Sequence, residues 1–175
     1  MTRALVFTLG PYRLLAGAER VREVQERGAA GRVRGGGHLS WRGRLVPEIG
    51  LRALLGLRGG GGEGTVDVIY GDHRDHDDFG DYGDSGSDSG AEAVVAFEVD
   101  RVLGLRTLED GRLHLLPALA PELARLFEVI FLDPADSRGI LCLDARPDAL
   151  LDLWRAHCEA HCKTDPGRAG PEHSS

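Results

Sequence analysis

The run from residue 41 to residue 52 constrains this chain more than any other part of its sequence. It reads Trp-Arg-Gly-Arg-Leu-Val-Pro-Glu-Ile-Gly-Leu-Arg, with an Arg-Gly pair between two apolar-rich flanks. This pattern predicts a strand, a tight turn and a second strand, and the apolar spacing from Ile49 onward predicts a short helix. Arg42 would then project from a rigid corner. The run offers no nucleophile, acid–base pair or set of metal ligands, so it indicates a surface that binds another protein.

Short stretches of alternating apolar and polar residues recur along the chain, separated by turns rich in Gly and Asp. Such stretches are typical of β-strands, and their number favours a sandwich or barrel architecture. Helical spacing is confined to residues 51–57, 121–126 and 147–162, with Pro147 at a first-turn position. The expected strands span residues 3–9, 12–15, 38–41, 44–48, 66–70, 94–100, 112–116, 127–132 and 140–143.

Length and composition are those of one globular domain in a reducing compartment. The 175 residues are enough to bury a self-sufficient core. No apolar run approaches the roughly 18–20 residues needed to cross a bilayer, and the first residues do not resemble a signal peptide. Three Cys, at positions 142, 158 and 162, form an odd set that does not suggest a disulfide framework. We therefore expect a cytoplasmic protein.

The acidity of the chain belongs to one segment. The net charge of −7 argues against a general nucleic-acid binder, but residues 72–90, with seven Asp and one Arg, account for −6 of it, which weakens that inference. We interpret residues 71–90 as a loop inserted between two strands. Lengthening a four-residue loop to about twenty residues costs only roughly 1.4 kcal/mol in closure entropy. Its Asp, Gly and Ser cannot bury enough apolar surface to order it, and the tail at 164–175 is expected to be disordered as well.

Two segments could bind metal ions. The acidic loop has many carboxylates, with His73 and His76, but lacks the register of a Ca²⁺-binding loop, so we favour a solvated loop. The pairs His157/His161 and Cys158/Cys162 share helix faces at a spacing of four. Zinc accepts both ligand types, but no second ligand pair is evident, so we favour a plain helix end and assign no metal.

The sequence carries no recognisable catalytic motif. Neither Gly-x-Ser-x-Gly nor a P-loop occurs. Gly59, Gly61 and Gly64 formally match a dinucleotide fingerprint, but they would follow a helix and precede a strand, the reverse of what that site needs. We expect no enzyme activity and no cofactor.

Five segments, taken in sequence order, resemble the CheW-like coupling domain of bacterial chemotaxis. In the opening run, Trp41-Arg42-Gly43, Leu45-Val46-Pro47 and Gly50-Leu51-Arg52 match the signature of that family. The other segments are residues 5–10, 21–24, 99–104 and 138–144. The resemblance extends from about residue 4 to residue 153.

The resemblance implies a mainly β domain over residues 1–163. It would consist of two small five-stranded β-barrels with short helices and a C-terminal helix. The first barrel would draw mainly on residues 12–100 and the second on the remainder, with the termini crossing between them.

The resemblance also implies a function, that of a non-catalytic adaptor. Such a protein couples the cytoplasmic tips of methyl-accepting chemoreceptors to the regulatory domain of a CheA-type histidine kinase. It would sit with receptor arrays at the inner face of the membrane without inserting into it. The partner-binding residues would be Val21, Glu23, Arg42, Gly43 and Asp100.

Some alternatives stay open at this point. Arg42 either contacts a partner or braces the corner internally, and Val21 is either a contact or a core residue. The chain departs from the family pattern at Gly50, where Asp is usual, at Glu128, where Gly is usual, and in a shortened stretch at residues 25–36. Other possible functions are a diverged scaffold for surface motility or second-messenger output, and a metal-responsive binding module.

Overall fold

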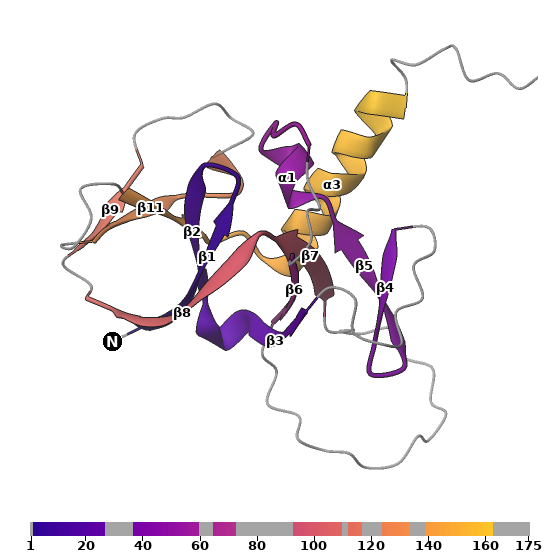
Figure 1. Cartoon of the computed structure of the whole chain (residues 1–175). Helices are drawn as coiled ribbons and strands as arrows, with labels where there is room; N and C mark the ends of the chain where they lie inside the picture. Colours follow the sequence, from indigo (N-terminus) through magenta and orange to yellow (C-terminus); the bar gives the residue numbers. More distant parts are fainter. Residues whose placement is uncertain are drawn as a thin grey trace, which may run out of the picture.

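The computed structural model of the chain describes residues 2–26, 37–59, 65–72, 93–109, 112–116, 124–133 and 139–162. These residues form two β-sheets, a short helix and a long C-terminal helix (Figure 1). The elements are β1 (Thr2–Leu9), β2 (Tyr12–Gly17), the 3₁₀ turn η1 (Ala18–Arg20), β3 (Val21–Glu26), β4 (His38–Trp41), β5 (Arg44–Ile49), α1 (Leu51–Leu54), β6 (Val66–Gly71), β7 (Val94–Val99), β8 (Arg101–Leu108), β9 (Leu113–Leu115), β10 (Val129–Leu132), β11 (Gly139–Leu143) and α3 (Pro147–Cys162).

The mainly β architecture with two sheets and a C-terminal helix is confirmed. One sheet has five strands in the order β3-β6-β7-β5-β4, and the other has six in the order β8-β1-β2-β11-β10-β9. The sixth strand is β8, and sequence patterning predicted neither this strand nor β3 of the five-stranded sheet. The pairing of β8 with β1 jumps from Gly104 opposite Val6 to Val102 opposite Phe7, which leaves Leu103 as the extra residue of a β-bulge. This bulge interrupts the alternation by which a strand is recognised.

The division of the chain between the sheets differs from the expected boundary at residue 12. Strand β2 pairs with β1 and β11, so residues 12–17 belong to the six-stranded sheet and the five-stranded sheet begins at Val21. The termini cross as expected: β1 and β2 lie in the six-stranded sheet, whereas α3 packs beside β5 and β7 of the other sheet (Figure 1).

Alternating residues of the central strands serve two different cores. In β1, Phe7 and Leu9 join a large cluster between the two sheets, whereas Val6 joins a cluster enclosed by the six-stranded sheet. In β6, Tyr70 joins the cluster between the sheets and Ile69 joins one enclosed by the five-stranded sheet. The central strands are therefore apolar on both faces, which explains why their sequences read as continuous apolar runs.

The structure confirms some of the other sequence predictions, corrects one and does not cover the rest. Strands β6 and β7 pair antiparallel, as expected for the hairpin that carries the acidic segment, although residues 73–92 lie outside the described residues. Helix α1 ends at Leu54 and not at Leu57, and α3 has the predicted bounds. The start of the helix expected at 121–126, the stretch at 27–36 and the tail from 163 also lie outside the described residues.

Candidate functional site: an exposed hairpin tip and its supports

The β4–β5 hairpin turns at Arg42 and Gly43, which lie between the paired residues Trp41 and Arg44. Both turn residues have positive φ, 49° for Arg42 and 77° for Gly43, as a type I′ hairpin turn requires. A side chain other than Gly pays roughly 1–2 kcal/mol for this conformation. Within the described part of the chain, Arg42 is the one residue other than Gly with positive φ. Local strain of this kind is often found at functional positions.

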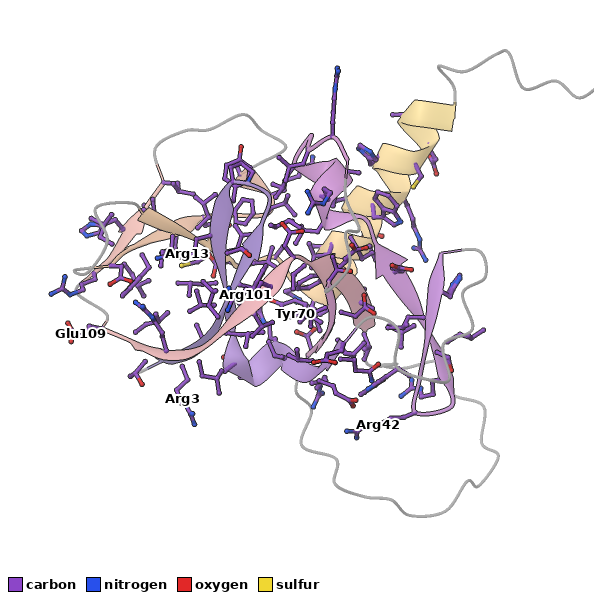
Figure 2. All side chains as sticks on the ribbon, in the orientation of Figure 1. Arg3, Arg13, Arg42, Tyr70, Arg101 and Glu109 are labelled. Carbon is purple, nitrogen blue, oxygen red and sulfur yellow. The ribbon has the colours of Figure 1, made fainter. Side chains whose placement is uncertain are left out.

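Glu23 of β3 holds the side chains at this tip. Its carboxylate accepts a hydrogen bond from Nε1 of Trp41 at 2.8 Å, from Nε2 of Gln25 at 2.6 Å and from Nε of Arg42 at 3.2 Å. The Arg42 guanidinium also lies over the Trp41 ring, 5.2 Å from its centroid. Nevertheless the Arg42 side chain remains 66% exposed (Figure 2). Arg42 is thus held by Glu23 and by the Trp41 ring, while most of its side chain stays accessible.

The hydrogen bonds to Glu23 also affect its protonation. The Trp41 indole N–H, then the Gln25 amide, and then Arg42 lower the pKa of the Glu23 carboxyl from its usual value, against a smaller opposing effect of burial. The carboxylate is therefore charged at neutral pH and keeps the tip assembled. Trp41 was absent from the residues expected to form this site, although its place next to the turn was visible in the sequence.

The other two expected contact residues have partners inside the molecule. Val21 begins β3, pairs with Tyr70 and packs, partly buried, against the cluster between the sheets. The Asp100 carboxylate accepts a hydrogen bond from the backbone N–H of Gly10 at 2.6 Å and forms an ion pair with Arg52 of α1. Asp100 therefore ties α1 to the β1–β2 turn, and its role in binding a partner stays a prediction.

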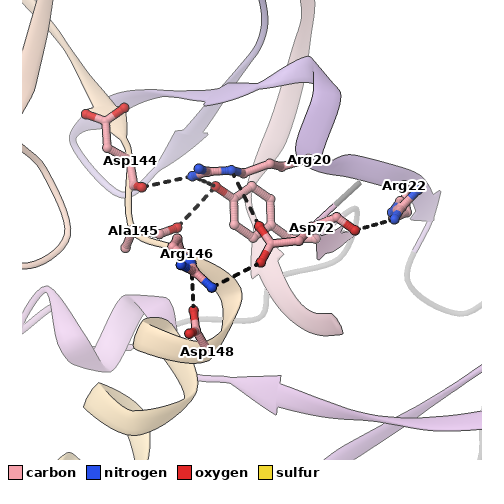
Figure 3. Close-up of polar contacts among 8 residues, drawn as sticks. Arg20, Arg22, Asp72, Asp144, Ala145, Arg146 and Asp148 are labelled. Carbon is pink, nitrogen blue, oxygen red and sulfur yellow. Dashed lines mark hydrogen bonds and ion pairs between the residues drawn. The ribbon is translucent and has the colours of Figure 1, made fainter. Parts of the chain in front are cut away.

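A second polar cluster links three segments that are far apart in the sequence (Figure 3). Arg20 of η1 donates to the carbonyl of Asp144 at 2.9 Å and to the Tyr70 hydroxyl at 3.4 Å. The Tyr70 hydroxyl in turn donates to the carbonyl of Ala145 at 3.2 Å. Burial, as the largest effect, raises the pKa of Tyr70, so its hydroxyl stays protonated as a donor.

Asp72 extends this cluster where the acidic segment leaves β6. Its carboxylate lies 3.8 Å from Arg20 and 3.8 Å from Arg146, and its backbone carbonyl accepts from Arg22 (Figure 3). Arg146 also pairs with Asp148 in the first turn of α3. No sequence pattern indicated this cluster, which fixes the root of the acidic segment to η1 and to the start of α3.

The structure gives a physical reason for Gly50, one of the departures from the family pattern. No side-chain hydrogen bond caps α1 at this residue. A Cβ on Gly50 would lie only 2.7 Å from Cζ3 of Trp154, because the indole of α3 rests directly on the Gly50 backbone. The Trp154 ring thus occupies the space that the side chain of a capping Asp would need at this position.

Metal-ligand candidates do not gather within the described part of the chain. Nowhere in it do three or more His, Cys, Asp or Glu side chains lie in a group that could hold a metal ion. His157 stacks on Trp154, with ring centroids 5.5 Å apart, and the side chains of residues 161 and 162 lie outside the description. Burial raises the pKa of the Cys142 thiol to about 12, which makes it unreactive at neutral pH.

Together these features define a class of protein: paired β-sheet subdomains that share one core and present a braced, exposed hairpin tip, which is the CheW-like fold. Among solved structures, the chain is similar to the scaffolding protein TtCheW from Thermoanaerobacter tengcongensis. The TM-score is 0.61 at 16% sequence identity, over 83% of this chain and 90% of that one. At this identity the similarity establishes the fold. No protein-family model matches the chain, and a search of curated proteins finds no significant match.

Helix α3 is the longest helix among the described residues, and none of the helices there combines the length and apolar character needed to span a membrane.

Proposed function

We propose that this chain is a non-catalytic adaptor that couples chemoreceptors to a CheA-type histidine kinase in bacterial chemosensory signalling. The CheW-like fold over 83% of the chain is the observation that carries this proposal. The adaptor acts in the cytoplasm, next to receptor arrays at the inner face of the membrane. One surface binds the helical tip of a receptor and another binds the regulatory domain of the kinase.

The chemistry of the hairpin tip supports a protein-binding role. Arg is favoured at interface hot spots, and its planar guanidinium can bind a carboxylate with two hydrogen bonds. Because Glu23 and the Trp41 ring already restrain Arg42, binding a partner orders little that was free before. Leu45, just after the turn, is 70% exposed and offers an apolar contact beside the charge.

The mechanism is positional. An adaptor that binds receptor and kinase at the same time raises the effective concentration of each for the other and fixes their relative orientation. A conformational change in the receptor can then alter kinase output without any bond being made or broken in the adaptor.

Binding measurements with purified fragments test the proposal. The immobilised chain should bind a receptor cytoplasmic fragment and a kinase regulatory domain in surface plasmon resonance. Arg42→Ala should weaken one of the two contacts by about 2 kcal/mol, roughly 30-fold in Kd. Arg155→Ala is the matched control, because the Arg155 side chain on α3 is also 66% exposed.

The two possible failures have different meanings. If a folded chain binds neither fragment, the adaptor function is wrong. If both fragments bind and Arg42→Ala changes neither affinity, the adaptor function stands and Arg42 only braces the hairpin.

A further inference from the structure

The contacts of Arg42 inside the chain occupy only one edge of its guanidinium group. Nε and Nη2 of Arg42 lie 3.2 Å and 3.1 Å from Oε2 of Glu23, and within the described residues no contact of Arg42 uses Nη1. A guanidinium can bind a carboxylate through its Nε–Nη2 edge or through its Nη1–Nη2 edge. The Nη1–Nη2 edge is therefore open, in a side chain that is 66% exposed.

Glu23 holds Arg42 by a single oxygen, because two neutral donors already occupy its carboxylate. Oε1 of Glu23 accepts from Nε2 of Gln25 at 2.6 Å, and Oε2 accepts from Nε1 of Trp41 at 2.8 Å. Both contacts of Arg42 go to Oε2, so the fork in which each carboxylate oxygen meets its own N–H is not formed. Trp41 and then Gln25 are also the largest causes that lower the pKa of the Glu23 carboxyl. Glu23 is thus stabilised mainly by these two donors and competes weakly for Arg42.

A second arginine makes the charge at the hairpin tip positive. Arg44 lies directly opposite Trp41 on the paired strand, so its side chain leaves the same face of the hairpin as the indole. Arg44 is exposed and forms no ion pair with any residue that the structure describes. Arg42 and Arg44 therefore outweigh the single negative charge of Glu23, and electrostatic complementarity favours a negatively charged group on the partner.

We propose that Arg42 binds the carboxylate of an acidic side chain on a protein partner through its Nη1–Nη2 edge, and that Trp41 is the positioning residue for this contact. The partner's carboxylate meets the guanidinium end-on, so the contact between Arg42 and Glu23 stays in place. Arg44 adds a second positive charge on the same face of the hairpin. Figure 2 shows Arg42 at the outer end of the five-stranded sheet, where a partner can reach it.

Trp41 positions Arg42 in two ways. Its N–H occupies the Glu23 carboxylate, which keeps that group from forming the full fork with Arg42. Its ring lies 5.2 Å from Cζ of Arg42, measured to the ring centroid, and this cation–π contact restrains the guanidinium. The inference rests on the proposed protein-binding role of the hairpin tip, and it names the chemical group that the tip recognises.

NMR of the full-length protein tests the contact at the Arg42 Nε–Hε signal and at the backbone amides of residues 42–44. The probe is the blocked peptide acetyl-Ala-Glu-Ala-Glu-Ala-amide, compared with acetyl-Ala-Gln-Ala-Gln-Ala-amide and with inorganic phosphate at equal ionic strength. We expect saturable shifts with the glutamate peptide, none with the glutamine peptide and much weaker shifts with phosphate. Arg42→Lys keeps the charge but loses the planar edge, so it should weaken peptide binding by about threefold or more. Arg3→Gln, which changes an exposed arginine of the other sheet, should leave binding unchanged.

Trp41→Phe tests the positioning role separately from stability. Without the indole N–H, the Glu23 carboxylate competes with the peptide for Arg42, so the peptide affinity should fall by about threefold, as expected for an exposed ion pair. Adding Glu23→Gln removes the competing charge, and this double variant should regain the affinity of the parent chain. A residue that only stabilises the fold gives no such rescue, because the second substitution removes a further interaction. The amide spectrum of each variant shows whether its fold is intact.

Three results would overturn the carboxylate contact: no shift at Arg42 with the glutamate peptide, phosphate binding as strong as peptide binding, or an undiminished affinity of Arg42→Lys. Parent-like affinity in Trp41→Phe, or no recovery in the double variant, would overturn the role of Trp41. None of these measurements involves receptor or kinase. If the peptide binds at Arg42 and both of those fragments fail to bind, the adaptor function is wrong and this contact stands. If both fragments bind and the peptide does not, this inference alone is wrong.

Discussion

Glu23 and Trp41 connect two strands that stand at opposite edges of one sheet. Glu23 lies on β3 and Trp41 on β4, the two outermost strands of the five-stranded sheet, and the indole N–H donates to the carboxylate at 2.8 Å. The sheet therefore curls until its two edge strands, β3 and β4, meet. No ladder of backbone hydrogen bonds pairs these two described strands, so side chains join them. This contact closes the barrel as well as fixing Arg42. Closure matters because exposed strand edges invite aggregation.

Replacing Trp41 by Phe should reveal the contribution of this hydrogen bond to stability. Phe keeps an aromatic ring under Arg42 but cannot donate to Glu23. A hydrogen bond to a charged group contributes about 1.5–3 kcal/mol. In the variant, water can hydrate the Glu23 carboxylate, because that side chain is 32% exposed. We therefore expect the free energy of unfolding in urea to fall by only about 1 kcal/mol. Tyr12→Phe, which removes a hydroxyl from an exposed ring, is the control. Equal losses in the two variants would mean that the indole hydrogen bond contributes nothing specific.

The pH dependence of stability should carry the signature of Glu23. Its pKa is lowered in the folded protein, so its carboxylate contributes stability that is fully present above its unfolded pKa of about 4.3. That contribution is lost as the pH falls through the folded pKa. The difference in unfolding free energy between the parent chain and Glu23→Gln should therefore stay constant from about pH 7 to pH 5 and shrink below about pH 4. Urea titrations at several pH values measure it, and a difference that does not shrink at all in acid would show that Glu23 acts in some other way.

The polar cluster around Tyr70 predicts a larger loss. Tyr70 is fully buried, and its hydroxyl donates to the Ala145 carbonyl while accepting from Arg20. In Tyr70→Phe the buried carbonyl loses this donor, which costs about 1–3 kcal/mol. Arg20→Ala should cost less, since Arg20 is only partly buried. Urea unfolding of the two variants checks the order, and a Tyr70→Phe protein as stable as the parent would show that water or the backbone satisfies the carbonyl.

The parts of the site that the sequence could predict are those set by neighbours in the chain. The Arg42-Gly43 turn follows from an Arg-Gly pair between alternating strands, and the structure has it with both φ values positive. The hydrogen bond between Trp41 and Glu23 joins residues eighteen positions apart, and Asp72 meets Arg20 and Arg146 across even longer separations. With 20 Arg in the chain, no sequence pattern indicates which arginine meets which carboxylate.

The same reasoning explains β8, one of the two strands that sequence patterning missed. The bulge at Leu103 disturbs the period of two in β8, so local alternation gives no clear signal there. The pairing partner of β8 is β1, about a hundred residues earlier, so the contact that makes β8 a strand is not local in the sequence.

Gly50 and Trp154 provide the sharpest test of how this chain departs from the family pattern. Restoring the usual residue by Gly50→Asp should destabilise the protein by about 1–3 kcal/mol, because the Trp154 ring occupies the space that the new Cβ needs. In a Trp154→Ala background that space is free. There the same substitution should be neutral or should stabilise the protein by up to about 1 kcal/mol, since the Asp side chain can cap α1.

A double-mutant cycle by urea unfolding measures this coupling directly. Trp154→Ala alone should cost several kcal/mol through the lost packing of its ring against the cluster between the sheets. The informative quantity is the difference between the two Gly50→Asp effects, which should reach about 2 kcal/mol or more if the ring and the Gly50 backbone compete for one space. Equal effects in both backgrounds would mean that the loss at position 50 arises from backbone conformation alone. In that case the exchange of a capping oxygen for an indole would not explain why Gly stands at this position.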